Sequence, residues 1–211
     1  MTGPSIAVVD YGAGNLVSIE QALTRVGATV TVVRDPGALR TADALVVPGV
    51  GAAAPAMDRL RSAGLVDPIR AWIAADRPFL GVCLGLQLLF DTSDEDGAAT
   101  LGVVRGRTVR LEDAPTLPHI GWNQVVRTAP HPLFDGIPDG ADFYFVHSYA
   151  GVPEDRAVVA ATTEHGSLFV SAVARGPLLG VQFHPERSGE DGLRLLANFT
   201  SIVRGASARA A

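Results

Sequence analysis

The first hundred residues alternate short apolar runs with segments whose apolar residues recur at helical spacing. The apolar runs are continuous, which is typical of strands buried on both faces of a parallel sheet; they occupy residues 5–10, 28–33, 44–47 and 78–82. The segments with helical spacing lie between them, at residues 16–26, 54–62 and 66–75, and Gly27 supplies a stop after the first. This β-α-β rhythm predicts an α/β fold with a mostly parallel central sheet flanked by helices.

The pattern changes after residue 100. The apolar runs become shorter, which predicts an additional antiparallel region in the second half; they read VVRGRTVRL, WNQVVR, FYFVHSY, VVAATT and LFVSAVA. Residues 178–183 return to a buried strand, and 189–204 close the fold as a helix. Neither an internal repeat nor a linker divides the chain, so we expect a single domain over residues 1–211.

Composition narrows the class of protein. Hydrophobic residues make up 47% of 211, which suits one well-packed domain. The net charge of -5, with no block of like charges, disfavours a nucleic-acid partner. No apolar run reaches the roughly 20 residues that a membrane-spanning helix needs, and the N-terminal segment lacks a basic flank, so we expect a cytoplasmic protein. The single cysteine excludes an internal disulfide.

Two features of the sequence could suggest a binding site for a nucleotide cofactor or a metal ion. Gly12 and Gly14 follow the first strand, but Val17 stands where a dinucleotide fingerprint has its third glycine, and the chain has no Lys for a phosphate loop. The acidic residues at 91–96 lack the spacing of metal ligands and are interpreted as a solvated loop. We therefore expect no cofactor and no metal.

Cys83 lies in Gly81-Val82-Cys83-Leu84-Gly85, between a buried strand and a segment, LGLQLLF, that we expect to be helical. This is the cysteine form of the nucleophile elbow, in which side chains two positions before and after the nucleophile would collide. Such a turn lifts the sulfur out at the carboxyl end of the sheet, and it places the thiol at a helix N-terminus, where a thiolate is favoured. The pattern predicts that Cys83 is a nucleophile.

His184 is the candidate base. It follows the strand at 178–183 and precedes Pro185, which disfavours a helical conformation for the histidine. In an extended segment, side chains 184 and 186 point to similar sides, so Glu186 could hold the imidazole through its other nitrogen. A Cys-His-Glu triad of this kind performs acyl transfer.

GVCLGLQLLF with a later VQFHPE resembles the triad-type (class I) glutamine amidotransferases. Within them, DYGAGN, PGVGA, PHIGWN, YFVHSY and HPERSG, in this order along nearly the whole chain, resemble the glutaminase subunits of imidazole glycerol phosphate synthase. The resemblance implies that glutamine is hydrolysed through a thioester on Cys83. It also implies that ammonia passes to a (β/α)₈-barrel cyclase subunit in a heterodimer serving histidine biosynthesis.

The resemblance also implies roles for further residues. Leu84 N–H and the segment around Val50 and Gly51 match the family's oxyanion site. Three residues match those that hold glutamine: Gln87, Ser148 and Tyr149. Five lie in segments that face the cyclase in the family: Asn15, Pro118, Ile120, Trp122 and Arg187. From the residues alone, Trp122 could equally be plain core.

The chain departs from the family's pattern in three places. Ile120 replaces a common Met, Arg187 a common Lys, and Ala52-Ala53 a usual Phe-Gly; Arg for Lys keeps the charge but changes the geometry of any ion pair at the interface. Alternative functions stay open: a cysteine peptidase or stress protein of related fold, a glutaminase for pyridoxal phosphate synthesis, and a non-catalytic binding subunit. The triad argues against the last, and PHIGWN does not fit the pyridoxal phosphate family.

Overall fold

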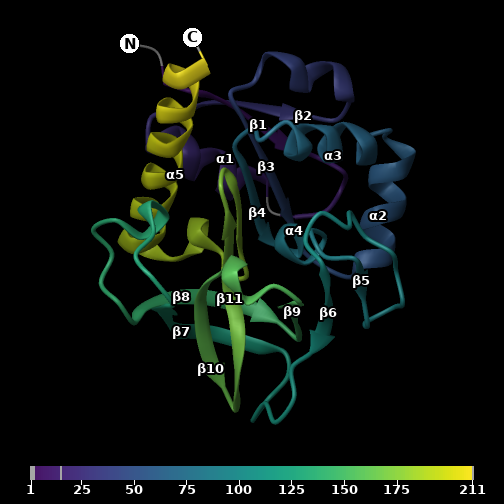
Figure 1. Cartoon of the computed structure of the whole chain (residues 1–211), viewed down its shortest axis with the longest axis vertical. Helices are drawn as coiled ribbons and strands as arrows, with labels where there is room; N and C mark the ends of the chain where they lie inside the picture. Colours follow the sequence, from purple (N-terminus) through teal and green to yellow (C-terminus); the bar gives the residue numbers. More distant parts are fainter. Residues whose placement is uncertain (1–2, 15, 211) are drawn as a thin grey trace.

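A mixed nine-stranded sheet is the frame of the computed structural model, which describes residues 3–14 and 16–210 (Figure 1). Its strands lie in the order β2-β1-β3-β4-β12-β11-β10-β7-β8. Their bounds are β1 Ser5–Val9, β2 Thr29–Val33, β3 Ala44–Gly49, β4 Phe79–Cys83, β7 His119–Arg127, β8 Ala141–His147, β10 Val159–His165, β11 Ser167–Arg175 and β12 Leu178–Val181.

One half of this sheet is parallel. β1 pairs with β2 and β3, β3 with β4, and β4 with β12, all in parallel. Every residue of β3, β4 and β12 is buried, as their continuous apolar runs predict. For β2 the expectation of burial on both faces is wrong. β2 is the edge strand, and its residues alternate between exposed and half-buried up to Val33, because no further strand covers its outer side.

The other half is antiparallel, in agreement with the change of pattern after residue 100. β12 pairs with β11, β11 with β10, β10 with β7, and β7 with β8, all antiparallel. A separate three-stranded sheet packs beside it; it contains β5 (Thr92–Ser93), β6 (Gly106–Arg110) and β9 (Tyr149–Pro153). Since β12 has a parallel neighbour on one side and an antiparallel one on the other, it is the boundary strand.

Helices cover both faces of the parallel half (Figure 1). α1 (Leu16–Arg25) and α5 (Gly189–Ala210) contribute to one hydrophobic core, and α2 (Ala53–Ser62) and α3 (Val66–Ala74) to the other. α5 continues to Ala210, beyond the predicted end at residue 204. Four short 3₁₀ segments complete the described elements: η1 Pro36–Thr41, η2 Pro132–Phe134, η3 Arg156–Val158 and η4 Pro185–Arg187.

The helix after Cys83 is shorter than LGLQLLF suggested. α4 spans only Leu84–Gln87, a single turn, and the amide of Leu89 then bonds to the carbonyl of Leu86. This tighter bond closes the turn, and the chain continues toward β5. The following residues, Leu88 to Phe90, are fully buried, so their apolar character reflects core packing and not a longer helix.

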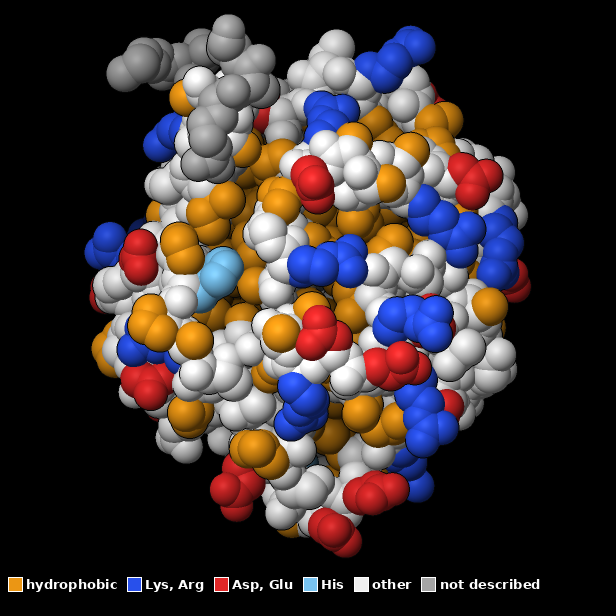
Figure 2. Space-filling model, in the orientation of Figure 1, with side chains coloured by type: hydrophobic (Ala, Val, Ile, Leu, Met, Phe, Trp, Pro, Cys, Tyr) orange, Lys and Arg blue, Asp and Glu red, His pale blue; other side chains and the backbone are white. Residues whose placement is uncertain are grey.

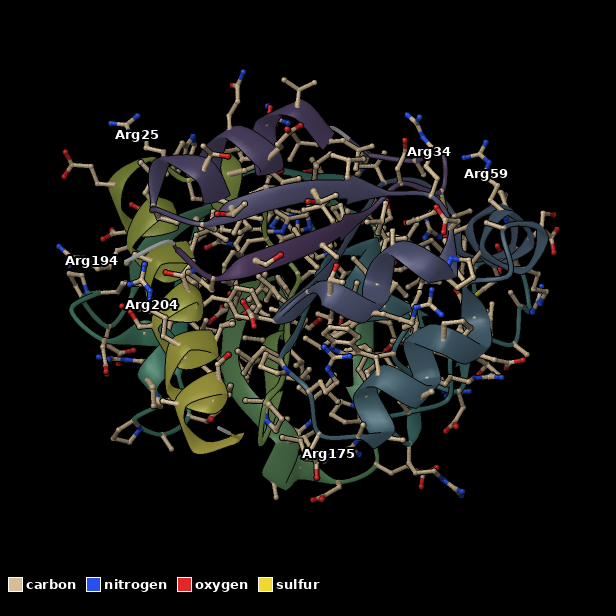
Figure 3. The ribbon with its side chains drawn as sticks, turned by 90° about the horizontal axis from the view of Figure 1, so that it is seen from above. Arg25, Arg34, Arg59, Arg175, Arg194 and Arg204 are labelled. Atoms are coloured by element: carbon tan, nitrogen blue, oxygen red, sulfur yellow. The ribbon has the colours of Figure 1, made fainter. Side chains whose placement is uncertain are left out.

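Acidic and basic side chains are interspersed over the face shown in Figure 2. In the view of Figure 3, Arg34 and Arg59 project from one edge of the molecule, and Arg25, Arg194 and Arg204 lie on the opposite side. Arg34 forms an ion pair with Asp10 at 2.7 Å. Across residues 3–14 and 16–210, no helix combines the length and the apolar character needed to cross a membrane.

Candidate active site

Cys83 is the last residue of β4 and the residue before α4. Its backbone has φ 54° and ψ -109°, a region that residues with a Cβ rarely adopt. Such a conformation costs on the order of 1–3 kcal/mol and persists only where the surroundings impose it. The strain predicted for a nucleophile elbow is therefore present at the cysteine.

The flanking glycines allow this turn. A Cβ on Gly81 would lie 2.5 Å from the carbonyl oxygen of Gly85, so these two positions do meet across the elbow, as the motif predicts. A Cβ on Gly85 would instead collide with the carbonyl oxygen of Val47 in β3. Gly85 is thus required chiefly by the close approach of α4 to the neighbouring strand.

His184 and Glu186 lie beyond the end of β12, which pairs in parallel register with β4 (Val181 opposite Val82). His184 has an extended backbone, and its Nδ1 lies 2.8 Å from Glu186 Oε1. Both side chains are buried, with 7% and 5% of their surface exposed. The pair therefore emerges at the same sheet edge as Cys83, with the carboxylate fixing the imidazole.

The charge state of His184 follows from these contacts. Burial lowers its pKa, but the interactions with Cys83 and Glu186 outweigh burial and raise the pKa to about 10. His184 Nε2 is buried and has no hydrogen-bond partner among the described residues that meets distance and angle limits. The effect of Cys83 on the pKa therefore reflects proximity and charge more than a formed hydrogen bond, and we expect a protonated imidazole near neutral pH.

Tyr144 in β8 and Ser188 hold the histidine backbone. The amide of His184 donates to the carbonyl of Tyr144 at 2.8 Å. The Ser188 hydroxyl donates to the carbonyl of His184 at 2.6 Å and accepts from the amide of Tyr144 at 3.0 Å. The position of the base therefore depends on the antiparallel half as well as on β12.

A cavity of about 260 Å³ opens beside Cys83. It brings together the cysteine and all of the residues that the sequence predicted for oxyanion and glutamine binding. Its lining includes Val50, Gly51, Cys83, Leu84, Gln87, Pro118, Ser148 and Tyr149. Segments far apart in sequence, from the loop after β3, from α4 and from the β8–β9 connection, thus form one pocket around the sulfur.

The predicted oxyanion segment follows β3, where Gly49 pairs with Cys83 in the parallel ladder. Tyr11 packs against Gly49 so closely that a Cβ there would collide with the phenol hydroxyl. Gly51 has φ +92°, with nothing within 4 Å of an added Cβ, and Val50 is 45% exposed. The segment is therefore anchored at Gly49 and open at residues 50 and 51.

Gln87 uses its amide nitrogen within the protein. The nitrogen donates to the carbonyl of Tyr149 at 2.8 Å and to Gln182 Oε1 at 3.1 Å. Since a carbonyl only accepts, the orientation of the Gln87 amide is determined. Its oxygen is therefore the group through which Gln87 could contact a substrate.

The predicted partner-facing residues lie mostly on the surface. Ile120 and Trp122 in β7 are 60% and 55% exposed, so Trp122 is not a core residue. The guanidinium of Arg187 stacks 4.0 Å over the ring of Tyr144, and Pro118 is exposed at the cavity. Asn15 lies outside the described residues.

Two groups near the site were not predicted as site residues from the sequence. Gln182, fully buried, places its side-chain nitrogen 3.6 Å from Cys83 Sγ. His119 Nδ1 contacts His147 Nε2 at 3.3 Å, and His147 Nδ1 contacts the carbonyl of Tyr149 at 2.9 Å. The sequence does carry a signal for Gln182. It is an amide in an apolar run, two positions before the candidate base, and therefore on the same side of an extended segment.

A strained cysteine elbow and a buried His–Glu pair, meeting at the carboxyl edge of a parallel sheet, define an α/β enzyme of the nucleophile-elbow class. The sequence also matches the family described as Glutamine amidotransferase class-I over residues 7–202. The chain belongs to this family, and is a glutamine amidotransferase.

Individual relatives are similar over nearly their full length. The imidazole glycerol phosphate synthase subunit HisH of Moorella thermoacetica is 51% identical over 202 residues, covering 95% of this chain and 96% of the relative. The protein of the same name from Chloroflexus aurantiacus is 52% identical over 200 residues, covering 92% and 94%.

Solved structures share the fold. A putative GMP synthase protein from Thermoplasma acidophilum superposes with a TM-score of 0.76 at 20% identity, covering 100% of this chain and 98% of that one. PurLQS from Thermotoga maritima gives 0.75 at 18% identity, covering 94% and 98%. At these identities the likeness concerns the fold alone.

Proposed function

We propose that this chain is the glutaminase subunit of imidazole glycerol phosphate synthase, acting in histidine biosynthesis as one glutamine amidotransferase domain over residues 1–211. It hydrolyses glutamine to glutamate and ammonia at Cys83 and delivers the ammonia to a cyclase subunit. The observation that carries the proposal is the convergence of strained Cys83 and the buried His184–Glu186 pair at one edge of the sheet. The HisH names of relatives about half identical to the chain support the choice of synthase.

The chemistry begins with the Cys83 thiolate. Its sulfur attacks the side-chain carbonyl carbon of glutamine and forms a C–S bond, while the carbonyl oxygen becomes an oxyanion. Protonated His184 gives its proton to the amide nitrogen, so the C–N bond breaks and ammonia leaves. His184, now neutral, takes a proton from water as the water attacks the thioester. The C–S bond then breaks, which releases glutamate and returns the thiolate.

The oxyanion needs N–H donors aimed at it. Leu84 supplies one as the residue after the nucleophile, and the open segment at Val50 and Gly51 supplies the other. Conformational freedom at Gly51 allows the peptide between these two residues to rotate, so its N–H could be turned toward Cys83 only when the partner is bound. Losing one donor costs on the order of 10²–10³ in rate, which would keep the free chain nearly silent.

The cavity walls bind the substrate. Gln87 offers its side-chain oxygen, and Ser148 and Tyr149 contribute to the same lining; all three line the cavity beside Cys83. A free glutamine carries an α-ammonium and an α-carboxylate, which need an acceptor and donors respectively. We expect these two requirements to make the pocket selective for the free amino acid.

The cyclase is a (β/α)₈ barrel that makes imidazole glycerol phosphate and an aminoimidazole carboxamide ribonucleotide. It docks on the face that bears Pro118, Ile120, Trp122 and Arg187. Exposed Ile120 and Trp122 are apolar side chains of the kind that anchor interfaces. Asn15, which belongs to the same face in the family, completes the proposed contact in a heterodimer.

Glutamate release from glutamine, measured on the chain alone and with the cyclase, tests the proposal. We expect slow release alone and a rise of roughly 10²-fold or more on addition of the cyclase together with its nucleotide substrate, the factor that one oxyanion donor supplies. Absence of glutamate release in the complex would refute the function. Activation by a synthase of pyridoxal phosphate, and not by the cyclase, would instead assign the chain to that pathway.

A further inference from the structure

Gln182 lies between the boundary strand β12 and the candidate base. Its side chain is fully buried, and both ends of the amide have partners. Its oxygen accepts from Gln87 Nε2 at 3.1 Å, and its nitrogen lies 3.6 Å from Cys83 Sγ. A buried amide without partners would be costly, so these contacts determine where the group points.

The direction of the Gln182 amide follows from one backbone carbonyl in this network. The carbonyl of Tyr149 can only accept, so Gln87 must turn its NH₂ group toward it at 2.8 Å, and His147 must carry a proton on Nδ1, at 2.9 Å. The same NH₂ group of Gln87 then meets the oxygen of Gln182. The NH₂ group of Gln182 is therefore the end that faces the sulfur. If the Gln182 amide were flipped, its NH₂ group would face the NH₂ group of Gln87, and two donors would meet without an acceptor.

A thiolate at Cys83 needs such a donor. Cys83 is 4% exposed, so water supplies little of the hydration that a charged sulfur loses on burial. A neutral thiol gains less, because its hydrogen bond to the carbonyl of Val146 is long, with 4.0 Å between Sγ and the oxygen. An N–H aimed at sulfur therefore stabilises the thiolate more than the thiol.

We propose that Gln182 is a catalytic residue whose side-chain N–H donates to Cys83 Sγ and stabilises the thiolate. It acts twice in the reaction, before attack on the substrate carbonyl and when the C–S bond breaks and the electron pair returns to sulfur. The proposal rests on the proposed function for the identity of the substrate, but the donor role is a property of the free chain.

The other titratable groups near the sulfur are accounted for. Protonated His184, which is supported by Glu186, carries the positive charge that faces Cys83. Burial raises the pKa of Tyr11, which stays neutral, and burial lowers the pKa of His147 to about 3, so it is neutral as well. Glu95 lines the same cavity, and burial raises its pKa. Gln182 is thus the neutral donor beside the His184–Cys83 pair.

The test is the pH dependence of alkylation of Cys83 by iodoacetamide in the free chain. Cys83 is the single cysteine, so the reaction reports on one atom and needs neither glutamine nor the partner. In Gln182→Leu, which keeps the volume and removes the donor, we expect the midpoint of the Cys83–His184 pair to rise by roughly one to two pH units. Gln182→Glu, which keeps an acceptor for Gln87 and places a carboxylate at the sulfur, should raise it further.

Gln124→Leu, at an exposed glutamine in β7, is the matched control and should leave the midpoint unchanged. Thermal unfolding followed by circular dichroism checks each fold, and Gln182→Met replaces Gln182→Leu if the latter does not fold. An unshifted midpoint in a folded variant, or an equal shift in the control, overturns the proposal. If the wild-type chain released no glutamate with its cyclase while Gln182→Leu still shifted the midpoint, the proposed function would be refuted and this inference would stand.

Discussion

The parallel and antiparallel halves of the sheet differ in what they bury. Every residue of β4 and β12 is buried, whereas β7 alternates along its length, with Ile120 and Trp122 exposed. The parallel half holds Cys83 in a strained turn between close-packed strands. In the antiparallel half, β10 and β11 are mostly buried, but β7 and β8 at its edge alternate between residues packed on the core and more exposed residues.

This difference places the nucleophile and the proposed partner-facing residues in different parts of the molecule. Cys83 and the segment before Gly51 belong to the parallel half, which has almost no tolerance for added atoms. Ile120 and Trp122, two of the proposed docking residues, belong to the antiparallel half, and the pocket wall at Tyr149 belongs to the separate three-stranded sheet beside it. His184 lies just past the boundary strand, and its amide bonds to Tyr144 of β8, so the base is where the two halves meet. Substitutions should therefore abolish catalysis in one half and alter its regulation in the other.

The largest effect should come from the nucleophile. Cys83→Ala should reduce glutamine-dependent turnover by on the order of 10⁴-fold or more, because no thioester can form. Turnover driven by added ammonia on the partnered cyclase should persist, since that reaction takes place on the other chain. Glutamine-dependent synthesis retained by this variant would contradict the role of the cysteine.

Glu186→Gln should come next, at the boundary between the halves. Loss of the carboxylate leaves the imidazole poorly oriented and less able to hold its proton, which should lower kcat by on the order of 10³–10⁴. The folded-state pKa of His184 is raised from 6.5 to about 10, so its stabilising contribution is complete below pH 6.5 and is lost as the pH rises through 10.

Urea unfolding between about pH 6 and pH 10 measures this linkage. The free energy of unfolding of the wild-type chain should contain a component that falls across that window, and Glu186→Gln should flatten it. A pH slope identical in the two proteins would show that the carboxylate does not support the charged histidine.

Gly85→Ala tests the packing of the parallel half. The added methyl group meets the carbonyl of Val47, a backbone atom that cannot move aside, so we expect a loss of about 1–3 kcal/mol in the free energy of unfolding. Gly205→Ala in α5 is the control: nothing lies within 4 Å of its Cβ, and alanine favours a helix. Equal stability of the two variants would mean that the elbow is looser than its geometry indicates.

The smallest effect should come from a substitution of Arg187, which lies on the proposed partner-facing side. Its guanidinium covers Tyr144, whose carbonyl accepts from the amide of His184, so partner contact there would bear on the base. Arg187→Ala should weaken activation by the cyclase by roughly 10-fold, with little change in the basal rate. Arg194→Ala, on α5, is the control, and equal activation in both variants would remove Arg187 from the coupling.

The parallel half was readable from the sequence because burial on both faces leaves a continuous apolar run. β3, β4 and β12 appear in this way, and the strand-to-helix turn at Cys83 carries its own glycine signature. The edge position of β2 was not readable, because its run of apolar residues is as continuous as that of a central strand. Strand order depends on long-range pairing that no local pattern encodes.

The site was readable only in part, for a related reason. His184 and Glu186 stand in a short motif with a mechanism attached. Gln182 stands in the same VQFHPE motif, but the motif gives it no role: its contact with Cys83 joins residues 99 positions apart and exists only once β12 lies beside β4. The short length of α4 was also hidden, since buried leucines after one helical turn look like a continuing helix.

The pleat of β7 has an evolutionary consequence. Ile120 and Trp122 face outward, while His119 and Asn123 on the other side of the strand join a hydrogen-bonded chain through His147 that ends at the carbonyl of Tyr149. Mutations on the outward side can follow changes in the surface of the proposed partner without altering the hydrogen bonds on the inward side. The outward residues of β7 can thus change together with the surface of the proposed partner, while the hydrogen-bonded chain constrains the inward residues of the same strand.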